Sequence, residues 1–167
     1  MTWEIREATA QDWPALWEIL EPVVRAGETF TWDRDTTEDQ ARAKWFKTAP
    51  GQTFVAVGTG GLDGVVLGTG ELHANQGGAG SHVANAGYMV RSGHGGRGIA
   101  RALCAYSLDA ARAAGFRAMQ FNAVVESNVR AVAAWQAMGF ETLATIPEAF
   151  QHPQLGYVGL HVMYRKL

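Results

Sequence analysis

A glycine-rich turn lies in the middle of the chain, between a strand-like run and a helix-like run. It reads Gly95-Gly96-Arg97-Gly98-Ile99-Ala100. The run before it, residues 86–90, is short and apolar, and the run after it is rich in alanine and leucine and stops at Gly115. A turn that opens a helix in this way leaves backbone N–H groups unpaired and pointing in one direction. The sequence therefore predicts strand, turn and helix, and favours a phosphate or pyrophosphate site over a connector that binds nothing.

The helix after the turn is predicted over residues 99–114. On a 3.6-residue period its apolar side carries Ile99, Leu103, Tyr106, Ala110 and Ala113. Arg101 and Asp109 fall on the opposite side, and Leu108 falls near this charged arc, where it does not fit the pattern. Gly115 stands where a helix commonly ends, because glycine enters the left-handed conformation without steric cost.

Length and composition predict one globular domain over residues 1–167, long enough to bury a full hydrophobic core. Hydrophobic residues make up 47% of the chain and charged residues 18%, which is typical of an ordered protein. The formal net charge is −2 without a basic cluster, so we expect no nucleic-acid partner. We also expect no membrane partner, because no apolar stretch is long enough to cross a bilayer.

The numbers and positions of the cysteines and histidines limit the kinds of site that this chain can form. Cys104 is the only cysteine, which forbids an internal disulfide, suits a reducing cytoplasm and predicts a packing residue rather than a nucleophile. The five histidines have no metal-ligand spacing, so no metal site is expected. The N-terminus lacks a basic segment followed by an apolar one, and we therefore expect a cytoplasmic location.

Hydrophobic periodicity and turn residues predict the element order β-α-α-β-β-β-α-β-α-β-β in a mixed α/β sheet. Fifteen of the 20 glycines lie between positions 51 and 98, so strands and turns are expected there, with a surface loop at residues 76–80. Thr9 is predicted to cap the first helix, and residues 36–39 to start the second. Beyond the strand before the glycine turn, strands are expected at residues 3–8, 53–57, 64–72, 116–125, 140–145 and 157–166, and a last helix at 128–138.

These features resemble the GCN5-related N-acetyltransferase superfamily. Its members carry a pyrophosphate loop written Gln/Arg-x-x-Gly-x-Gly/Ala, and Gly98 and Ala100 stand at the small-residue positions of that pattern. Gly95 departs from it, because Gln or Arg is usual there. A later helix that opens with Asn and ends in Gly-Phe is matched by Asn128 and residues 139–140. The resemblance covers nearly the whole chain and implies an α/β (α+β) fold: a mixed, mostly antiparallel twisted sheet with splayed strands four and five and about four flanking helices.

The C-terminal half is similar to one branch of the superfamily, which includes the fungal acetyltransferases acting on azetidine-2-carboxylate and related cyclic imino acids. The likeness rests on residues 121–128, on the helix that carries Trp135 and on residues 147–153. Members of this branch use asparagines in the active site rather than an obvious acid-base pair. The resemblance implies these roles for Asn85, Asn122 and Asn128.

The two upstream asparagines, Asn85 and Asn122, are the residues expected to bind the acceptor, because an amide side chain suits a small amino-acid carboxylate. The alternative for Asn85 is a residue that ends a loop. The alternative for Asn122 is a strand residue bonded to a neighbouring turn. Asparagine is uncommon within strands, which favours a functional role for Asn122.

The resemblance implies that acetyl-CoA is the co-substrate and that its pantetheine arm enters between the splayed strands. The backbone of Val90 would then bind the pantetheine, and an amide near Tyr88 or Met89 would face the thioester oxygen and stabilise the developing oxyanion. Main-chain amides and the helix dipole hold the phosphates, so Gly95 need not abolish binding. The cofactor-binding residues expected are Val90, Gly95, Gly96, Arg97, Gly98, Ile99, Ala100, Asn128 and Trp135.

Asn128, Tyr88 and Met89 are the expected catalytic residues. Asn128 is predicted to contact the cofactor or the tetrahedral intermediate, although an N-cap is the structural alternative. Trp135 stands where many superfamily members carry a tyrosine that protonates the leaving thiolate. Tryptophan cannot act as that acid, so Trp135 is expected to form an apolar wall.

The sequence leaves several candidates for the residues that transfer protons during the reaction. Glu71 and Glu126 are the candidate bases, and both residue types are more often surface carboxylates. Tyr88 and Tyr157 are candidates for a relay through water. His94 is a candidate neighbour of the phosphates. His152 is a candidate for the wall of the acceptor pocket.

Together these features predict an acetyl-CoA-dependent N-acetyltransferase that acts on a small-molecule amine, such as an amino or imino acid, in a ternary complex. Gly95 and Trp135 favour a rival hypothesis, an acyl-CoA-binding sensor without turnover. A third hypothesis is acetylation of proteins or peptides. Members of the superfamily are often dimers, so a second copy of the chain is a candidate partner.

Overall fold

The structure is a computed structural model that describes residues 2–167. Within these residues, seven strands form one sheet in the order β1-β2-β3-β4-β5-β7-β6. Every neighbouring pair is antiparallel except β4 and β5, which are parallel. The strands are β1 (Thr2–Glu7), β2 (Gln52–Thr59), β3 (Val66–Ala74), β4 (Val83–Val90), β5 (Ala118–Val125), β6 (Glu141–His152) and β7 (Gly156–Lys166).

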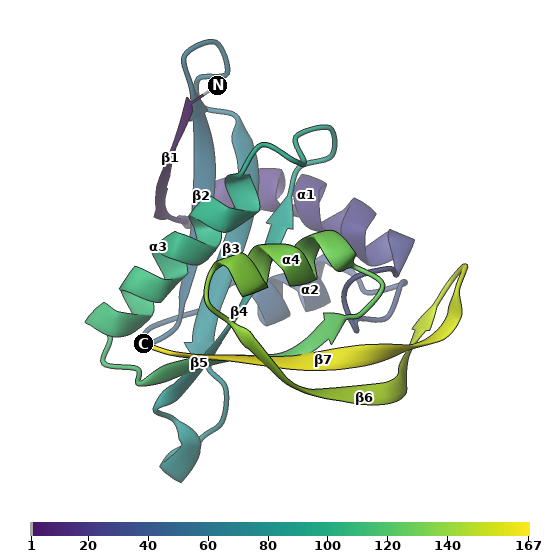
Figure 1. Ribbon diagram of the computed structural model, residues 1–167. Helices are drawn as coiled ribbons and strands as arrows, with labels where there is room; N and C mark the ends of the chain where they lie inside the picture. The colour runs from purple at the N-terminus through teal and green to yellow at the C-terminus, as the bar shows by residue number, and fades with distance from the viewer. Residues whose placement is uncertain (1) are drawn as a thin grey trace.

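Four α-helices in the described part of the chain cover the sheet, two on each face (Figure 1). They are α1 (Trp13–Ala26), α2 (Glu38–Trp45), α3 (Ile99–Ala113) and α4 (Val129–Ala137). Short 3₁₀ turns occupy Ala10–Asp12 and Gly78–Gly80. The predicted element order and the mixed, mostly antiparallel sheet are confirmed. Among the described residues, no helix is long and apolar enough to span a membrane.

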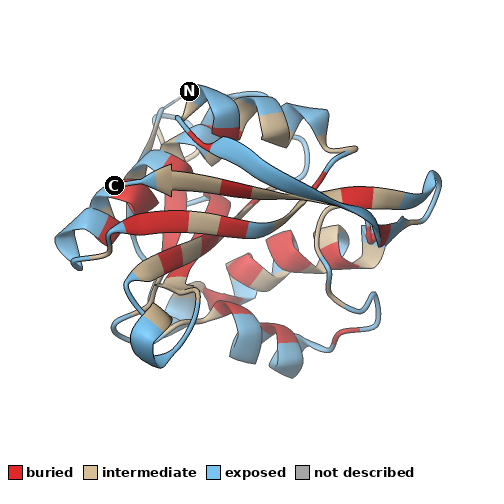
Figure 2. Ribbon diagram, turned by 60° about the horizontal axis from the view of Figure 1, so that its bottom comes forward, coloured by how far each residue is buried: buried red, intermediate tan, exposed pale blue. Residues whose placement is uncertain are grey.

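Two hydrophobic clusters hold the layers together, one on each side of the sheet. The cluster under α3 and α4 contains Phe54, Leu103, Phe121 and Trp135, and the cluster under α1 and α2 contains Leu16, Trp45 and Met89. In Figure 2 the buried residues lie on the sheet and on the helix sides that face it. Burial of these apolar faces is the main favourable contribution to folding.

The gap between β4 and β5 is the feature of the sheet that positions the site. The two strands pair only at Val83 with Ala118 and at Ala84 with Met119. Beyond Ala84, β4 continues to pair with β3 as far as Val90, whereas its other edge is open. The predicted splaying of strands four and five is confirmed.

Helix α3 buries Ile99 and Leu103 as predicted, but its buried face also includes residues outside the predicted one. Leu108 is 2% exposed, and Cys104 is fully buried, whereas Ala113 at the end of the predicted face is exposed. The reason lies in β3, where a Cβ built on Gly68 would stand 2.9 Å from the Ile99 side chain. The missing side chain lets α3 pack closely against the sheet and bring a broader face into the core.

Of two local predictions about helix starts, the one for α2 is confirmed and the one for α1 holds only in part. Thr37 caps α2 as expected, with its Oγ1 accepting from the Gln40 amide at 3.3 Å and its amide donating to Gln40 Oε1 at 2.9 Å. Thr9 instead precedes the 3₁₀ turn, and α1 starts after it, at Trp13. A proline in the first turn of α1 is compatible with this start, because the first helical N–H groups have no partner within the helix.

Residues 147–153, which lie between the strands expected at 140–145 and 157–166, are mostly strand. Strand β6 runs to His152, with a shift in its pairing with β7 between Ile146 and Phe150. Glu148 lies in this bulge with a φ of 52°. A bulge lets a strand continue past an unpaired residue, which is why the proline at position 147 did not end it. The far end of the β6–β7 hairpin extends beyond the rest of the sheet (Figure 1).

Candidate active site

A cavity of about 740 Å³ opens where β4 and β5 separate. Its lining comes from the segment after α1, from β3, β4 and β5, from the glycine turn and from α4. The glycine turn lies at one end of this cleft, and Glu71 on β3 and Asn122 on β5 line it elsewhere. The structure therefore brings most of the predicted site residues to one continuous cleft.

The glycine turn leads directly into α3. Gly98 is the residue before the helix and has a φ of 85°, and Gly96 has a φ of 76°. L side chains rarely adopt these angles, so both positions favour glycine. Gly95, Gly96, Gly98, Ile99 and Ala100 line the cleft, whereas Arg97 is exposed and lies outside the lining. The first N–H groups of α3 have no partner within the helix, and the positive end of its dipole lies at this end of the cleft.

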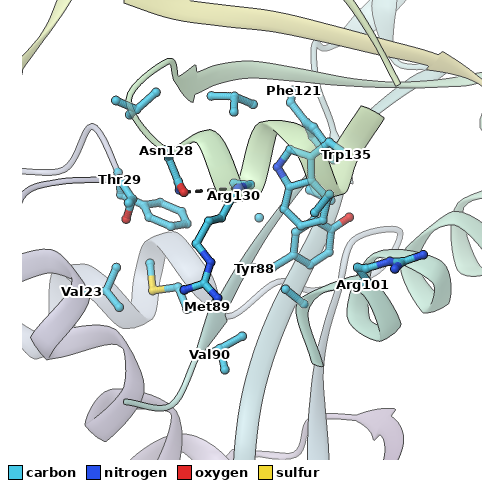
Figure 3. A pocket seen from close by; sticks show the side chains of 18 of the residues that line it. Val23, Thr29, Tyr88, Met89, Val90, Arg101, Phe121, Asn128, Arg130 and Trp135 are labelled. Atoms are coloured by element: carbon cyan, nitrogen blue, oxygen red, sulfur yellow. Dashed lines mark hydrogen bonds between the residues drawn. The ribbon is translucent and has the colours of Figure 1, made fainter. Parts of the chain in front are cut away.

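Two polar side chains beside the turn fit an anionic ligand. Arg130 on α4 reaches over the turn, with its Nη2 3.2 Å from the position that a Cβ on Gly96 would occupy. Figure 3 shows Arg130 extending from α4 into the cleft. His94 also lines the cleft, and its Nδ1 is buried without a hydrogen-bond partner among the described residues. Arg130 was not predicted from the sequence, because its place over the turn depends on how α4 packs.

The open edge of β4 presents main-chain donors to the cleft. Arg91 N donates to Leu67 O, and Asn75 N donates to Val83 O, which fixes the hydrogen-bonding phase of the β3–β4 pair. Amides alternate in direction along an antiparallel strand, so the N–H groups of Met89 and Gly87 point to β3. The N–H groups of Tyr88 and Val90 point to the gap.

The Tyr88 side chain turns away from the acceptor side. Its hydroxyl lies 2.6 Å from Ser107 Oγ on α3, and Ser107 Oγ donates its own proton to Cys104 O at 2.8 Å. Tyr88 is therefore the donor in the first bond. Burial raises the pKa of the Tyr88 phenol well above its ordinary value. Burial also raises the pKa of the Cys104 thiol to about 11, as befits a packing residue.

Trp135 and Asn128 line the wall that α4 contributes. Trp135 is 8% exposed, and its ring lies in a tilted contact with Tyr88 at a centroid distance of 5.1 Å. Asn128 Oδ1 accepts a hydrogen bond from Ala131 N at 3.3 Å, so this side chain caps α4. Figure 3 shows this bond at the edge of the cleft. The structural alternative for Asn128 is thus present, and the residue also lines the cleft.

Glu71 is a buried carboxylate on the α1–α2 side of the sheet, only 7% exposed. Its Oε2 accepts from His73 Nδ1 at 2.6 Å and lies 3.7 Å from Lys47 Nζ. Its Oε1 lies toward Gly87 in the cleft lining, where a built Cβ would be 3.2 Å away. A Cβ on Gly87 would also stand 3.3 Å from the Trp45 ring. Glycine at position 87 therefore keeps the space in front of the carboxylate open.

Asn85 and Asn122, the residues expected to bind the acetyl acceptor, both line the cleft, but their side chains have different hydrogen-bond partners. Asn85 Oδ1 accepts from Ala86 N at 2.8 Å and covers one of the amides on the open edge of β4. Asn122 donates to Asn75 Oδ1 at 2.7 Å and accepts from Gln120 Nε2 at 3.0 Å. Asn75 and Gln120 were not predicted from the sequence, because each reaches Asn122 through tertiary placement.

Three other candidates lie outside the cleft. Glu126 is exposed, and its Oε1 accepts from Gly159 N at 2.6 Å, which ties β5 to β7. Tyr157 is 66% exposed on β7 and lies outside the cleft lining. His152 Nδ1 accepts from the amides of residues 154 and 155, both at 3.2 Å, and so stabilises the hairpin turn. In residues 2–167 no cluster of three or more His, Cys, Asp and Glu side chains is placed to hold a metal ion.

Comparison with known proteins identifies the family. A profile of the acetyltransferase (GNAT) family matches residues 6–140. The structure of a GCN5-related N-acetyltransferase from Kribbella flavida has 47% sequence identity and a TM-score of 0.94, covering 99% of this chain and 98% of that one. A phosphinothricin acetyltransferase from Sinorhizobium meliloti, solved in complex with AcCoA, shares the fold at 21% identity, with a TM-score of 0.87 over 100% of this chain and 89% of that one.

A curated relative extends the comparison to a fungal protein. N-acetyltransferase aca1 of Schizosaccharomyces pombe is 26% identical over an alignment of 140 residues, and the match covers 75% of this chain and 66% of that protein. The match thus spans just under two thirds of the relative's length. The family profile covers most of this chain, and its matched region includes the β4–β5 gap, the glycine turn and α4. This chain belongs to the acetyltransferase (GNAT) family.

Proposed function

We propose that this protein, acting as a single domain over residues 1–167, transfers the acetyl group of acetyl-CoA to the amine of a small molecule in a ternary complex. The observation that carries the proposal is the open edge of β4, whose amides lead from the glycine turn toward Glu71. The AcCoA complex of the phosphinothricin acetyltransferase and the name of the fungal relative support the same chemistry.

The residues at the glycine turn fit the phosphates of acetyl-CoA. The orphaned Nδ1 of His94 and the guanidinium of Arg130 lie beside a helix N-terminus, and a buried nitrogen without a partner is costly unless a ligand or water completes it. In this proposal the N–H groups of Gly98, Ile99 and Ala100 bind the phosphates. Gly95 and Gly96 let the backbone approach them.

Strand β4 then binds the rest of the acetyl donor. The N–H of Val90 bonds to the pantetheine arm, and the N–H of Tyr88 faces the thioester oxygen. Met89 is the weaker candidate for this donor, because its N–H points to β3. A preorganised donor at this place stabilises the developing oxyanion and contributes roughly 3 kcal/mol. Trp135 forms an apolar wall along the arm, and the Asn128 amide adds a polar contact on the α4 wall.

Glu71 is the general base in this proposal. Its Oε1 takes the proton of the acceptor amine as the nitrogen forms its bond to the acetyl carbon and the carbon–sulfur bond breaks. The leaving thiolate takes a proton from solvent, because Trp135 is not an acid and the Tyr88 hydroxyl bonds to Ser107. Holding both substrates in one cleft supplies a further part of the acceleration.

Asn85 and Asn122 bind the acceptor beside Glu71. The chain of amides from Gln120 through Asn122 to Asn75 fixes the orientation of the Asn122 side chain and leaves one of its N–H groups for an acceptor oxygen. This arrangement supports a small amino or imino acid, whose carboxylate accepts hydrogen bonds from amides.

The test is acetyl transfer to a panel of amino acids, cyclic imino acids, simple amines and short peptides. Release of the CoA thiol and the mass of the N-acetyl product are measured for the wild type and for Glu71→Gln. The proposal expects product from at least one small amine and a strong loss in Glu71→Gln. Tight CoA binding without product from any amine would support the sensor hypothesis, and product from peptides alone would support protein acetylation.

A further inference from the structure

The glycine turn carries little side-chain charge toward the cleft. Gly95, Gly96 and Gly98 have no side chains, and Arg97 lies outside the cleft lining. A Cβ built on Gly95 or Gly98 would have no atom of the described residues within 4 Å, its immediate chain neighbours aside. The turn therefore offers main-chain amides and open space to a ligand that bears several negative charges.

A positively charged side chain lies over this turn, but it belongs to helix α4 and not to the turn. The first turn of α4 carries Arg130, whose Nη2 lies 3.2 Å from a Cβ built on Gly96 and is, apart from the neighbouring residues 95 and 97, the one atom of the described residues within 4 Å of it. Within residues 2–167 the Arg130 guanidinium has no ion-pair or hydrogen-bond partner, although it lines the cleft. An unpaired cation at the N-terminus of a second helix, beside a helix-terminal anion site, is arranged to receive an anion.

A second arginine in the cleft lining does not share this position. Arg101 belongs to α3, and Figure 3 shows Arg101 and Arg130 on opposite sides of Tyr88. The buried Nδ1 of His94, which also lines this end of the cleft, has no hydrogen-bond partner among the described residues. A polar ligand at this end would supply one. These observations concern the turn end of the cleft and are separate from the acceptor side.

We propose that Arg130, reaching across from α4, supplies to the diphosphate of CoA the positive charge that no side chain of the glycine turn presents to the cleft, and that the missing side chain of Gly96 leaves the room for it. This inference rests on the proposed use of acetyl-CoA. It assigns a binding role to a residue outside the glycine turn. It also explains how a turn with glycine at position 95 retains a charged contact to the ligand.

The experiment measures dissociation constants by calorimetry, without acceptor or turnover, for CoA, dephospho-CoA and S-acetylpantetheine. The variants are Arg130→Gln, Gly95→Arg, the double variant and Arg112→Gln. Arg112 pairs with Asp109 near the other end of α3, so Arg112→Gln removes an equal charge away from the cleft. Thermal melting checks that each variant is folded, which is expected because residue 130 is exposed.

Arg130→Gln is expected to weaken CoA and dephospho-CoA about tenfold each, since a hydrogen bond to a charged group contributes more than a neutral one. S-acetylpantetheine, which lacks the diphosphate, should bind equally to both proteins, and Arg112→Gln should bind CoA like the wild type. Gly95→Arg should recover most of the loss in the double variant. The difference in CoA affinity between the wild type and Arg130→Gln should become smaller as the salt concentration is raised from roughly 50 to roughly 500 mM, because salt screens the attraction between the guanidinium and the diphosphate.

Three results would overturn the proposal. Unchanged CoA affinity in Arg130→Gln would show that Arg130 does not bind CoA. An equal loss for S-acetylpantetheine would make Arg130 a structural residue of the cleft, and a loss confined to CoA but absent with dephospho-CoA would move the contact to the 3′-phosphate. Because no acceptor is present, failure of acetyl transfer would leave these binding results intact, and the two proposals fail separately.

Discussion

The hydroxyl of Tyr88 donates to Ser107 Oγ at 2.6 Å, which joins β4 to α3 behind the cleft. This bond turns the only acidic proton of Tyr88 away from the acetyl donor. Ser107 is fully buried, and its own proton is bonded to Cys104 O. The pair is therefore a structural link between sheet and helix, and the cleft receives the ring and the main chain of Tyr88.

Removing this link should destabilise the fold modestly. Tyr88→Phe and Ser107→Ala are each expected to lower the free energy of unfolding by about 1 kcal/mol, the typical net contribution of one hydrogen bond. Because the two residues share the bond, the double variant should lose less than the sum of the single losses. Urea unfolding of the four proteins measures this. Strictly additive losses would mean that the bond contributes nothing.

Alkaline pH should destabilise the protein through Cys104. Burial raises the pKa of its thiol from 9.0 to about 11 in the folded state. A raised folded pKa means that the associated stability is complete below pH 9 and is lost as the pH rises toward 11, because the unfolded chain ionises first. The loss in the free energy of unfolding is about 2–3 kcal/mol, because each tenfold difference in the acid dissociation constant between the folded and unfolded chains corresponds to about 1.4 kcal/mol.

The measurement is urea unfolding at pH 8.0 and pH 10.5, for the wild type and Cys104→Ala. The variant should be less stable at pH 8.0, because it leaves a small cavity, but its decline with pH should be shallower. The pKa of the Tyr88 phenol is also raised, so some decline above pH 10 remains in both proteins. Identical slopes would contradict the assignment to Cys104.

Glu71→Gln tests the proposed base with almost no change in shape. We expect kcat to fall by about 100-fold, in the range typical of general-base catalysis, while the KM for acetyl-CoA changes little. Glu126→Gln is the matched control, since Glu126 ties β5 to β7 outside the cleft. If Glu126→Gln were the more damaging change for kcat, the base would be wrongly assigned.

His73 is expected to act through Glu71 rather than on the substrate. It and Lys47 both contact Oε2, which leaves Oε1 toward Gly87 and the cleft. His73→Phe removes the donor and should lower kcat about tenfold at constant KM, because the carboxylate loses a charge-assisted bond. His73→Asn places a donor near the former Nδ1 and should recover most of that loss.

The control for His73 is His161→Phe. His161 is a histidine on β7 whose Nδ1 bonds to Thr145 Oγ1 at 2.7 Å, and it lies outside the cleft lining. Its replacement should leave kcat close to that of the wild type. A failure of His73→Asn to exceed His73→Phe would argue against a positioning role through the Nδ1 donor.

Gly96→Ala should weaken CoA binding. Gly96 has a φ of 76°, which costs an L residue roughly 1 kcal/mol, and its Cβ would press on Arg130 Nη2 at 3.2 Å. We expect at least a fivefold rise in the dissociation constant of CoA. Gly95→Ala is the comparison, because its Cβ meets nothing within 4 Å, and it should lose clearly less. Equal losses at both positions would show that backbone conformation and Arg130 do not matter here.

Much of the fold and one end of the site could be predicted because the signals are local. The glycine turn and the cap at Thr37 each depend on a few consecutive residues, and local hydrogen bonds decide them. The acceptor side could not be resolved in this way. Glu71 and Glu126 look alike in the sequence, and only burial and partners separate them, since Glu71 lies in the cleft lining and Glu126 bonds to Gly159.

The sequence by itself determined the order of the elements and the glycine turn that opens α3, because periodicity, capping and glycine placement act within one segment. Its family resemblance also indicated the splayed pair of strands. The tertiary structure decided which face of α3 is buried, how far β6 continues, where the Tyr88 proton points and which arginine stands over the turn. Each of these depends on contacts between segments far apart in the chain. Gly68 beneath α3 and Arg130 above Gly96 are examples, because no local pattern encodes the distance between them and their partners.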